Sequence, residues 1–340
     1  MRAAHVRRLG SHLMWVAALA VACPAAGAKV FPYRALRRIA LPAAANVSAL
    51  AVVGRDLYAG QGDSVSLYAP TGALRIAHRR LDGTVRALAA VDGQIVVAVS
   101  HPSSLEFLAA KSLRVLRQRA LIAASPSALL YDPAVHMLFI EDRAGHTVTR
   151  LDPQTGRTLG SVRLAGALGQ MAANGRGTLY VANATHDAID VTDARGMRYE
   201  GAIPLRRCHA PHALAMDTVG RRLFVACSNG RALIIDADLG FTFVRLPIQR
   251  GGHLRAAFAY RPLGPHGWKG GVFIAGGGAL SAIQMQAFVR YRAGGRLPVT
   301  RRITALALAP AAGVLWLAVA RGGGKPAALW RLAAPVSESQ

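Results

Sequence analysis

The sequence has 340 residues, of which 52% are apolar, so it can build one large repeat domain or two ordinary domains with full cores. It carries 41 Lys and Arg against 17 Asp and Glu, and no run of five or six like charges occurs, which excludes a basic tail. The excess charge has two interpretations. It either forms a surface for polyanions or membranes, or it reflects an Arg-rich proteome or an acidic exterior.

The first 28 residues have the three parts of a secretory signal. Arg2, Arg7 and Arg8 give a basic start, an apolar core follows over 13–22, and residues 26–28 form a small-x-small cleavage site. The pattern predicts an exported protein in the periplasm.

Cys23 offers a second interpretation, a lipid anchor. The residues before it lack the Leu that such sites prefer, and Pro24 follows directly, so we expect soluble release. No later stretch approaches the roughly 20 unbroken apolar residues of a membrane-spanning helix.

A short apolar cluster recurs through the rest of the chain. Successive clusters begin 38 to 49 residues apart, which is the length of a four-stranded blade of a β-propeller. Seven clusters predict seven blades. The clusters begin at Leu57, Ile95, Leu138, Leu179, Leu223, Val272 and Leu315.

Each cluster stands second in a repeated order of four strands. A strand of small apolar residues such as 49–52 comes first, and a turn rich in Gly, Asp, Asn or Pro separates it from the cluster. An alternating strand such as 188–191 comes third, and a more polar strand such as 158–164 closes the unit. Small residues suit the crowded axis, and polar residues suit the outer edge.

The two ends of the chain complement each other. The last repeat has only three strands, near 303–309, 314–320 and 327–332, whereas 33–42 is typical of a fourth strand with no first three. We predict an all-β, seven-bladed propeller of four-stranded blades, closed by the N-terminal outer strand joining the C-terminal blade. The predicted division is a signal peptide over 1–28, the propeller over 29–335 and a short tail over 336–340.

The repeats resemble those of the YVTN family of seven-bladed propellers, from Tyr33 to about Pro335. The clearest copy is Gly177-Thr178-Leu179-Tyr180-Val181-Ala182-Asn183, followed by Ala188-Ile189-Asp190-Val191. A second is Arg222-Leu223-Phe224-Val225-Ala226-Cys227. The resemblance implies the fold, and such repeats occur in exported proteins with unrelated roles, so the function has to be argued from a site.

Strand order places two loops of each blade on one face: the loop entering the first strand and the loop joining the second and third. We expect this face to be cationic, with few acids, chiefly Asp142 and Asp187. Converging guanidinium groups bind carboxylates or phosphates, although ordinary solvated arginines are the alternative. The ligand-binding candidates are Arg86, Arg143, His212, His253, Arg255 and Arg302.

The segment entering the fifth blade gathers Cys208, His209 and His212. A thiolate with imidazoles suits Cu or Zn, but the spacing matches no standard metal or haem signature. Alternatively, Cys208 forms a disulfide with Cys227, which the hairpin returns to the same level, as expected in an oxidising compartment. Two free thiols are the third possibility, and His212 has a bland interpretation as a channel-lining repeat residue.

Two function classes stay open. The first is a non-catalytic periplasmic binding or scaffold protein, a monomer without a cofactor, whose cationic face takes an anionic small molecule or protein partner. The alternative is an exported propeller enzyme or a dehydrogenase-associated subunit, lactonase-like or quinone/amine dehydrogenase-like. Nucleic-acid binding would be unselective, because aromatics make up only 6% of the chain and stacking platforms are scarce.

Overall fold

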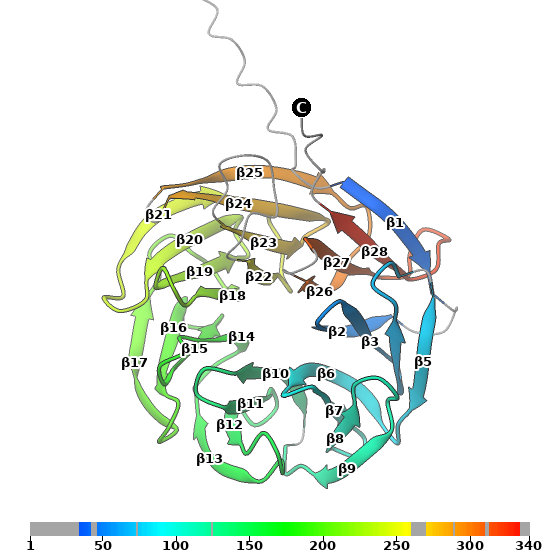
Figure 1. Ribbon diagram of the computed structural model, residues 1–340. Coiled ribbons are helices and arrows are strands. Elements are labelled where there is room, and N and C mark those ends of the chain that lie inside the picture. Colours follow the sequence, from blue (N-terminus) through cyan, green and yellow to red (C-terminus); the bar gives the residue numbers. More distant parts are fainter. Residues whose placement is uncertain are drawn as a thin grey trace, which may run out of the picture.

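The computed structural model describes residues 34–41, 46–72, 74–123, 125–259, 270–287, 290–309 and 313–333. The predicted signal peptide, Cys23 and the tail lie outside these ranges. The described chain is all-β and forms seven four-stranded antiparallel sheets arranged in a ring around a central channel (Figure 1). The predicted seven-bladed propeller is therefore confirmed.

Each of the first six blades uses four consecutive strands, which run in order from the channel to the outer edge. Blade one has β2 (Val47–Val53), β3 (Asp56–Gln61), β4 (Ser64–Tyr68) and β5 (Arg75–Arg80), and blade two has β6 (Thr84–Val91), β7 (Gln94–Ser100), β8 (Ser104–Ala109) and β9 (Val115–Ala120). Blade three has β10 (Pro126–Asp132), β11 (Met137–Asp142), β12 (Thr147–Leu151) and β13 (Thr158–Arg163), and blade four has β14 (Leu168–Ala173), β15 (Thr178–Asn183), β16 (Ala188–Asp193) and β17 (Arg198–Pro204). Blade five has β18 (Pro211–Asp217), β19 (Arg222–Cys227), β20 (Arg231–Asp236) and β21 (Thr242–Pro247), and blade six has β22 (Arg255–Ala259), β23 (Gly270–Gly276), β24 (Ala279–Ala287) and β25 (Arg290–Pro298).

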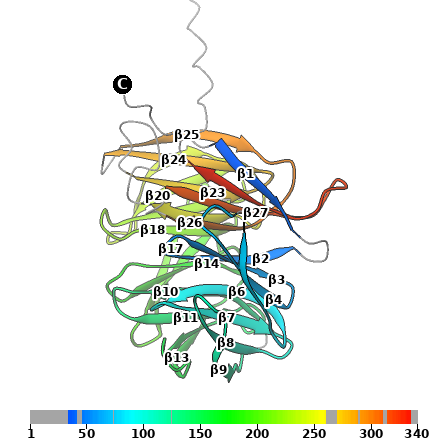
Figure 2. The ribbon, with the colours of Figure 1, turned by 45° about the vertical axis from the view of Figure 1, so that its right-hand side comes forward.

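Blade seven joins the two ends of the chain. Its inner strands are β26 (Ile303–Ala309), β27 (Val314–Val319) and β28 (Ala328–Ala333), and its outer strand is β1 (Arg34–Ala40). The strand β1 pairs antiparallel with β28, with Ala40 opposite Ala328, and the two lie side by side in both views (Figures 1 and 2). The predicted closure is confirmed, and it gives blade seven a fourth strand like every other blade.

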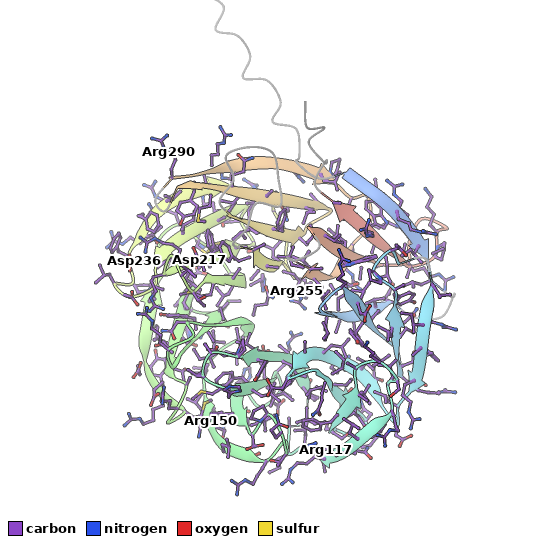
Figure 3. The ribbon with its side chains drawn as sticks, viewed as in Figure 1. Arg117, Arg150, Asp217, Asp236, Arg255 and Arg290 are labelled. Carbon is purple, nitrogen blue, oxygen red and sulfur yellow. A yellow bond between two sulfur atoms is a disulfide. The ribbon has the colours of Figure 1, made fainter. Side chains whose placement is uncertain are left out.

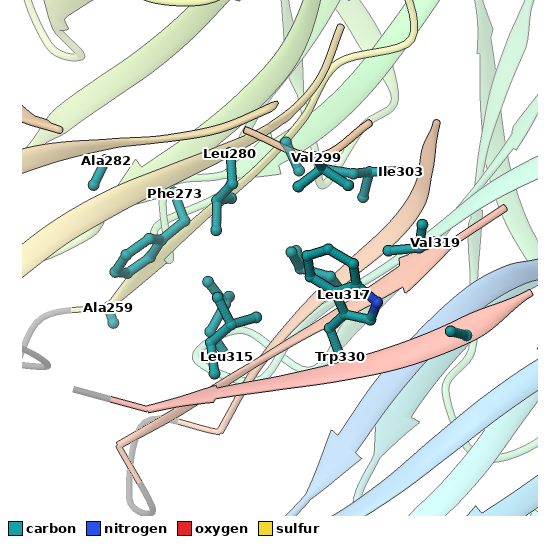
Figure 4. Close-up of a cluster of buried hydrophobic side chains, with 13 residues drawn as sticks. Ala259, Phe273, Leu280, Ala282, Val299, Ile303, Leu315, Leu317, Val319 and Trp330 are labelled. Atoms are coloured by element: carbon teal, nitrogen blue, oxygen red, sulfur yellow. The ribbon is translucent and has the colours of Figure 1, made fainter. Parts of the chain in front are cut away.

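The core lies between blades. The second strands are the most buried, because they have a neighbouring blade on both faces: β11, β23 and β27 are buried along their whole length. Figure 4 shows one such layer, where Phe273 and Leu280 of blade six pack against Leu315, Leu317 and Trp330 of blade seven. Each fully buried Leu or Phe contributes about 1.5–3 kcal/mol, and the layer repeats around the ring.

The first strands share an irregularity at the channel rim. Among the described strands, six of the seven innermost ones shift register near their start, so that one residue, or two in β14, is left unpaired in the ladder. A β-bulge of this kind re-aims the side chain of the extra residue. The residues in the bulges are Ser48, Arg86, Ser127, Gly169 with Gln170, His212 and Thr304. The strand β22 has no register shift, and Arg255 is its first paired residue, opposite Ala275.

Candidate anion-binding site

Several of the bulge residues, among them Ser48, Arg86 and Ser127, border a cavity of about 130 Å³ at one mouth of the channel. Arg86, Arg143 and Arg255 come together there, from blades two, three and six. The strand β22 lies across the channel from β6 and β10, and Figure 3 places Arg255 at the edge of the central opening. The cavity therefore has guanidinium groups on opposite walls.

Each arginine is held differently. Arg86 occupies the bulge of β6, and its Nε donates to Ser100 Oγ at 2.8 Å. Arg143 follows β11 in a turn, and 56% of its side chain is exposed. Arg255 is more enclosed: burial lowers the pKa of its guanidinium and the charge of Arg143 adds to this, whereas Glu141 acts in the opposite direction. The guanidinium of Arg255 is thus the least solvated of the three, and its positive charge is the one that a nearby anion would stabilise most.

Glu141 is the acid of this cavity, and sequence reasoning missed it. Its side chain is 1% exposed, accepts a hydrogen bond from Ser127 Oγ at 2.8 Å and lies 3.9 Å from Arg143 Nε. Burial raises the pKa of its carboxyl, whereas Ser127, Arg143 and Arg255 lower it. The three arginines therefore face a single, partly neutralised carboxylate, and the cavity keeps an excess of positive charge.

Comparison of the blades reveals why Glu141 is unusual. Its pairing partner is Ala128, the residue just after the bulge of β10. The matching partners in other blades are Gly60, Ala98, Ala226, Ala275 and Ala318. The available sequence signal for Glu141 was that a carboxylate stands at a position where the other blades have small or apolar residues. It was hidden because the surrounding second strand is apolar and is typical of core.

Gln170 borders both the cationic cavity and a second cavity of the channel. Its Oε1 accepts from the Ala256 N–H at 2.8 Å, and its Nε2 lies 3.4 Å from the Ala256 carbonyl oxygen. This amide bridge joins blade four to blade six and passes over blade five. The second cavity has a volume of about 300 Å³, and its walls are largely apolar and include Leu130, Met216 and Phe258.

The remaining predicted residues lie beside or away from the cavity. The rings of His212 and His253 stack with centroids 6.2 Å apart, but neither lines the cavity. Burial lowers the pKa of His212, and His253, Arg255 and Arg143 lower it further, in that order. His212 is therefore neutral at pH 7. Arg302 is exposed and does not border the cavity, so the structure does not bring it together with the other arginines.

Two of the residues predicted as candidate metal ligands, Cys208 and His209, interact with other partners. Cys208 forms a disulfide with Cys227, with Cα atoms 5.4 Å apart, and both residues are buried. His209 Nδ1 lies 3.0 Å from Asp187 Oδ2. A disulfide sulfur is not a thiolate ligand. Within the described ranges, no three His, Cys, Asp or Glu side chains gather as a metal site.

Comparison with protein-family models gives no match, and neither does comparison with curated proteins. The seven-bladed architecture is shown, and membership of the YVTN family stays a prediction from the repeats. In the described part of the chain, no helix is long and apolar enough to span a membrane.

Proposed function

We propose that this protein is a non-catalytic periplasmic binding propeller that captures a small anion at the cationic mouth of its channel. The observation that supports this most directly is the meeting of Arg86, Arg143 and Arg255, from three blades, at one cavity whose acid is a single buried carboxylate. Guanidinium groups pair with carboxylate and phosphate oxygens through two parallel hydrogen bonds, which gives both affinity and orientation.

The size of the cavity limits the anion. An apolar cavity of about 150 Å³ in a well-studied protein holds a benzene molecule, so a space of about 130 Å³ suits a group of roughly five or six heavy atoms. Phosphate, sulfate and a short carboxylate meet this limit. Because Arg255 faces Arg86 and Arg143 from the opposite wall, a doubly charged anion is favoured over a singly charged one.

Glu141 acts as an internal counterion in this proposal. When the cavity is empty, its carboxylate offsets part of the field of Arg143 and Arg255. A bound anion competes with it for the same guanidinium groups, so protonation of Glu141 accompanies binding. Affinity for the anion should therefore rise as the pH falls.

The alternative, an exported propeller enzyme of the lactonase-like or dehydrogenase-associated kind, has one observation in its favour. Glu141 is a buried carboxyl group with a raised pKa at a cavity, which is the situation of many general acids and bases. The variant Glu141→Gln separates the two functions. A binding protein keeps or improves its affinity for the anion, whereas an enzyme loses turnover while its affinity for substrate persists.

Calorimetric titration with phosphate, sulfate and oxalate at low ionic strength tests the proposal. The native protein should bind at least one of these anions with one site per chain. The variant Arg255→Gln should weaken binding by at least tenfold, because a hydrogen bond to a charged group contributes about 1.5–3 kcal/mol. Arg163→Gln, on the outer strand β13, is the matched control and should change nothing. Equal affinity in all three proteins would refute the site.

A further inference from the structure

The outer edge of the propeller is unevenly charged. The outer strands β25, β1, β5 and β9 each carry two or three arginines and no acidic residue. The outer strands β13, β17 and β21 carry one arginine each, and β17 also holds Glu200. The four rich strands belong to blades six, seven, one and two, which are consecutive around the ring, so they form one arc (Figure 1).

The arginines of this arc lie at the surface. Arg37, Arg79, Arg119 and Arg296 are exposed, and Figure 3 labels Arg290 and Arg117 near the two ends of the arc. On β25 and β9, arginines stand two residues apart, which puts them on the same face of the strand about 7 Å from each other.

Few of these charges are neutralised within the protein. Arg80 forms an ion pair with Asp63 at 2.6 Å, and Arg292 Nε donates to the neutral Gln284 Oε1 at 2.7 Å. Arg38 lies over the Trp330 ring at 4.3 Å and Arg117 over the Phe107 ring at 4.9 Å, contacts that position a guanidinium without cancelling its charge. The arc therefore presents a continuous positive field to solvent.

Protection of the sheet edges does not account for this arc. Charged side chains on an edge strand prevent edge-to-edge pairing, and all seven outer strands are such edges. The strands β13, β17 and β21 occupy the same place in their blades and have one arginine each. The arginines beyond that number need another explanation.

We propose that this arc, which we name the arginine arc and define as the outer strands β25, β1, β5 and β9, binds an acidic polysaccharide. The arc follows the convex edge of four blades, so a flexible linear chain can follow it, whereas a flat bilayer touches one or two neighbouring blades. The four strands have no exposed Phe, Tyr or Trp, since Tyr291 is buried, and His78 on β5 is their one exposed aromatic ring, so platforms on which nucleic-acid bases could stack are scarce. Guanidinium groups pair well with carboxylate groups and other oxyanions of such a chain.

Two triple variants with equal charge loss test the proposal. Arg79→Gln, Arg119→Gln and Arg296→Gln remove three charges from the arginine arc, and Arg163→Gln, Arg198→Gln and Arg245→Gln remove three from the other outer strands. Heparin is the probe, and its dissociation constant is measured at several salt concentrations with the purified protein. Urea unfolding of each variant checks that the fold persists.

The arc variant should bind heparin at least tenfold more weakly than the native protein at low salt. Its plot of log affinity against log salt should also be shallower by about two, since a flexible single-stranded polyanion releases roughly 0.7 counterion per neutralised charge. The control triple should lose less than threefold, and Arg86→Gln with Arg255→Gln should bind heparin as the native protein does. That last variant separates the arc from the channel cavity.

Three results would overturn the proposal. Equal loss in the two triples would show that net charge alone attracts heparin. Binding to phosphatidylglycerol vesicles that depends on the arc, without arc-dependent binding of heparin, would assign the surface to a membrane. Single-stranded DNA that binds as tightly as heparin and with the same dependence on the arc would assign it to nucleic acid.

Discussion

The two ends of the central channel differ in chemistry although the same strands build both. At one end, side chains from the start of the first strands and from the adjoining turns give a cavity with Arg86, Arg143 and Arg255. At the other end, residues further along the first strands give a larger, mostly apolar cavity. The difference arises because the bulge near the strand start frees one residue from the ladder, whereas the residues after it alternate between the core and the channel. The converging arginines thus lie at the end that carries the bulges.

The largest effect is expected from a variant that reverses one charge at the cationic end of the channel. Arg255→Glu places a second carboxylate opposite Arg86 and Arg143, so binding of phosphate or oxalate should fall by a hundredfold or more. A single lost charged hydrogen bond already costs about 1.5–3 kcal/mol, and reversal adds repulsion. Calorimetric titration measures the loss, and Arg163→Glu on β13 is the control. Unchanged affinity in Arg255→Glu would contradict the assignment of the cavity.

Removal of the bridge between the ends is the second test. Gln170→Ala deprives the Ala256 N–H and carbonyl of their partner, and the free energy of unfolding should fall by about 1–3 kcal/mol. Urea unfolding monitored by circular dichroism measures this. Gln118→Ala, at an exposed position of β9, is the control and should lie within about 0.5 kcal/mol of the native protein. A loss no larger than that of the control would mean that the amide does not join blades four and six.

A third variant, Glu141→Gln, removes the carboxylate of the cationic end and so increases its net positive charge. Because burial raises the pKa of Glu141, the folded state holds its proton more tightly than the unfolded state. The stability that this proton provides is present at low pH and lost as the pH rises through the raised pKa. Glu141→Gln should abolish this loss and tighten anion binding severalfold at pH 7. Unfolding curves and titrations at pH 4 to 8 measure both, and weaker anion binding by Glu141→Gln would contradict its role as counterion.

The smallest expected effect concerns His212. Its pKa is lowered in the folded protein, so as the pH falls through the ordinary value of about 6.5 the unfolded state takes up a proton first. Stability should decline below that pH, and His212→Ala should remove this part of the decline. Melting temperatures between pH 4 and 8 test it, with the exposed His186→Ala as control. An identical pH profile in His212→Ala and the native protein would count against it.

The fold could be predicted because each blade contains a short apolar cluster that recurs at the length of one blade. The apolar clusters at 57, 95, 138, 179, 223, 272 and 315 all lie in second strands, which are buried between blades and therefore have little freedom in composition. The closing strand was predictable for the same reason, because 33–42 has the polar character of an outer strand and no other sheet to join.

The candidate site was less accessible to sequence reasoning. Arg86 and Arg255 were found because they stand at the start of a first strand, where strand order alone places them at the mouth. Glu141 was missed because it lies inside an apolar strand, and Gln170 because its partner is two blades away. Arg302 shows the converse: it stands one position before β26, whereas the residues of blade seven that border the cavity are Ala305 and Leu306.

The pairing of β1 with β28 also bears on the order of assembly. The chain is synthesised from its N-terminus, so β1 emerges first and stays without its partner until the last strand, almost 300 residues later, is complete. Joining two segments this far apart costs the chain much of its freedom at one step. Blades one to six can form from neighbouring segments, but the circle becomes whole only when its first and last strands meet. We therefore expect the pairing of β1 with β28 to be the last step in the folding of the propeller.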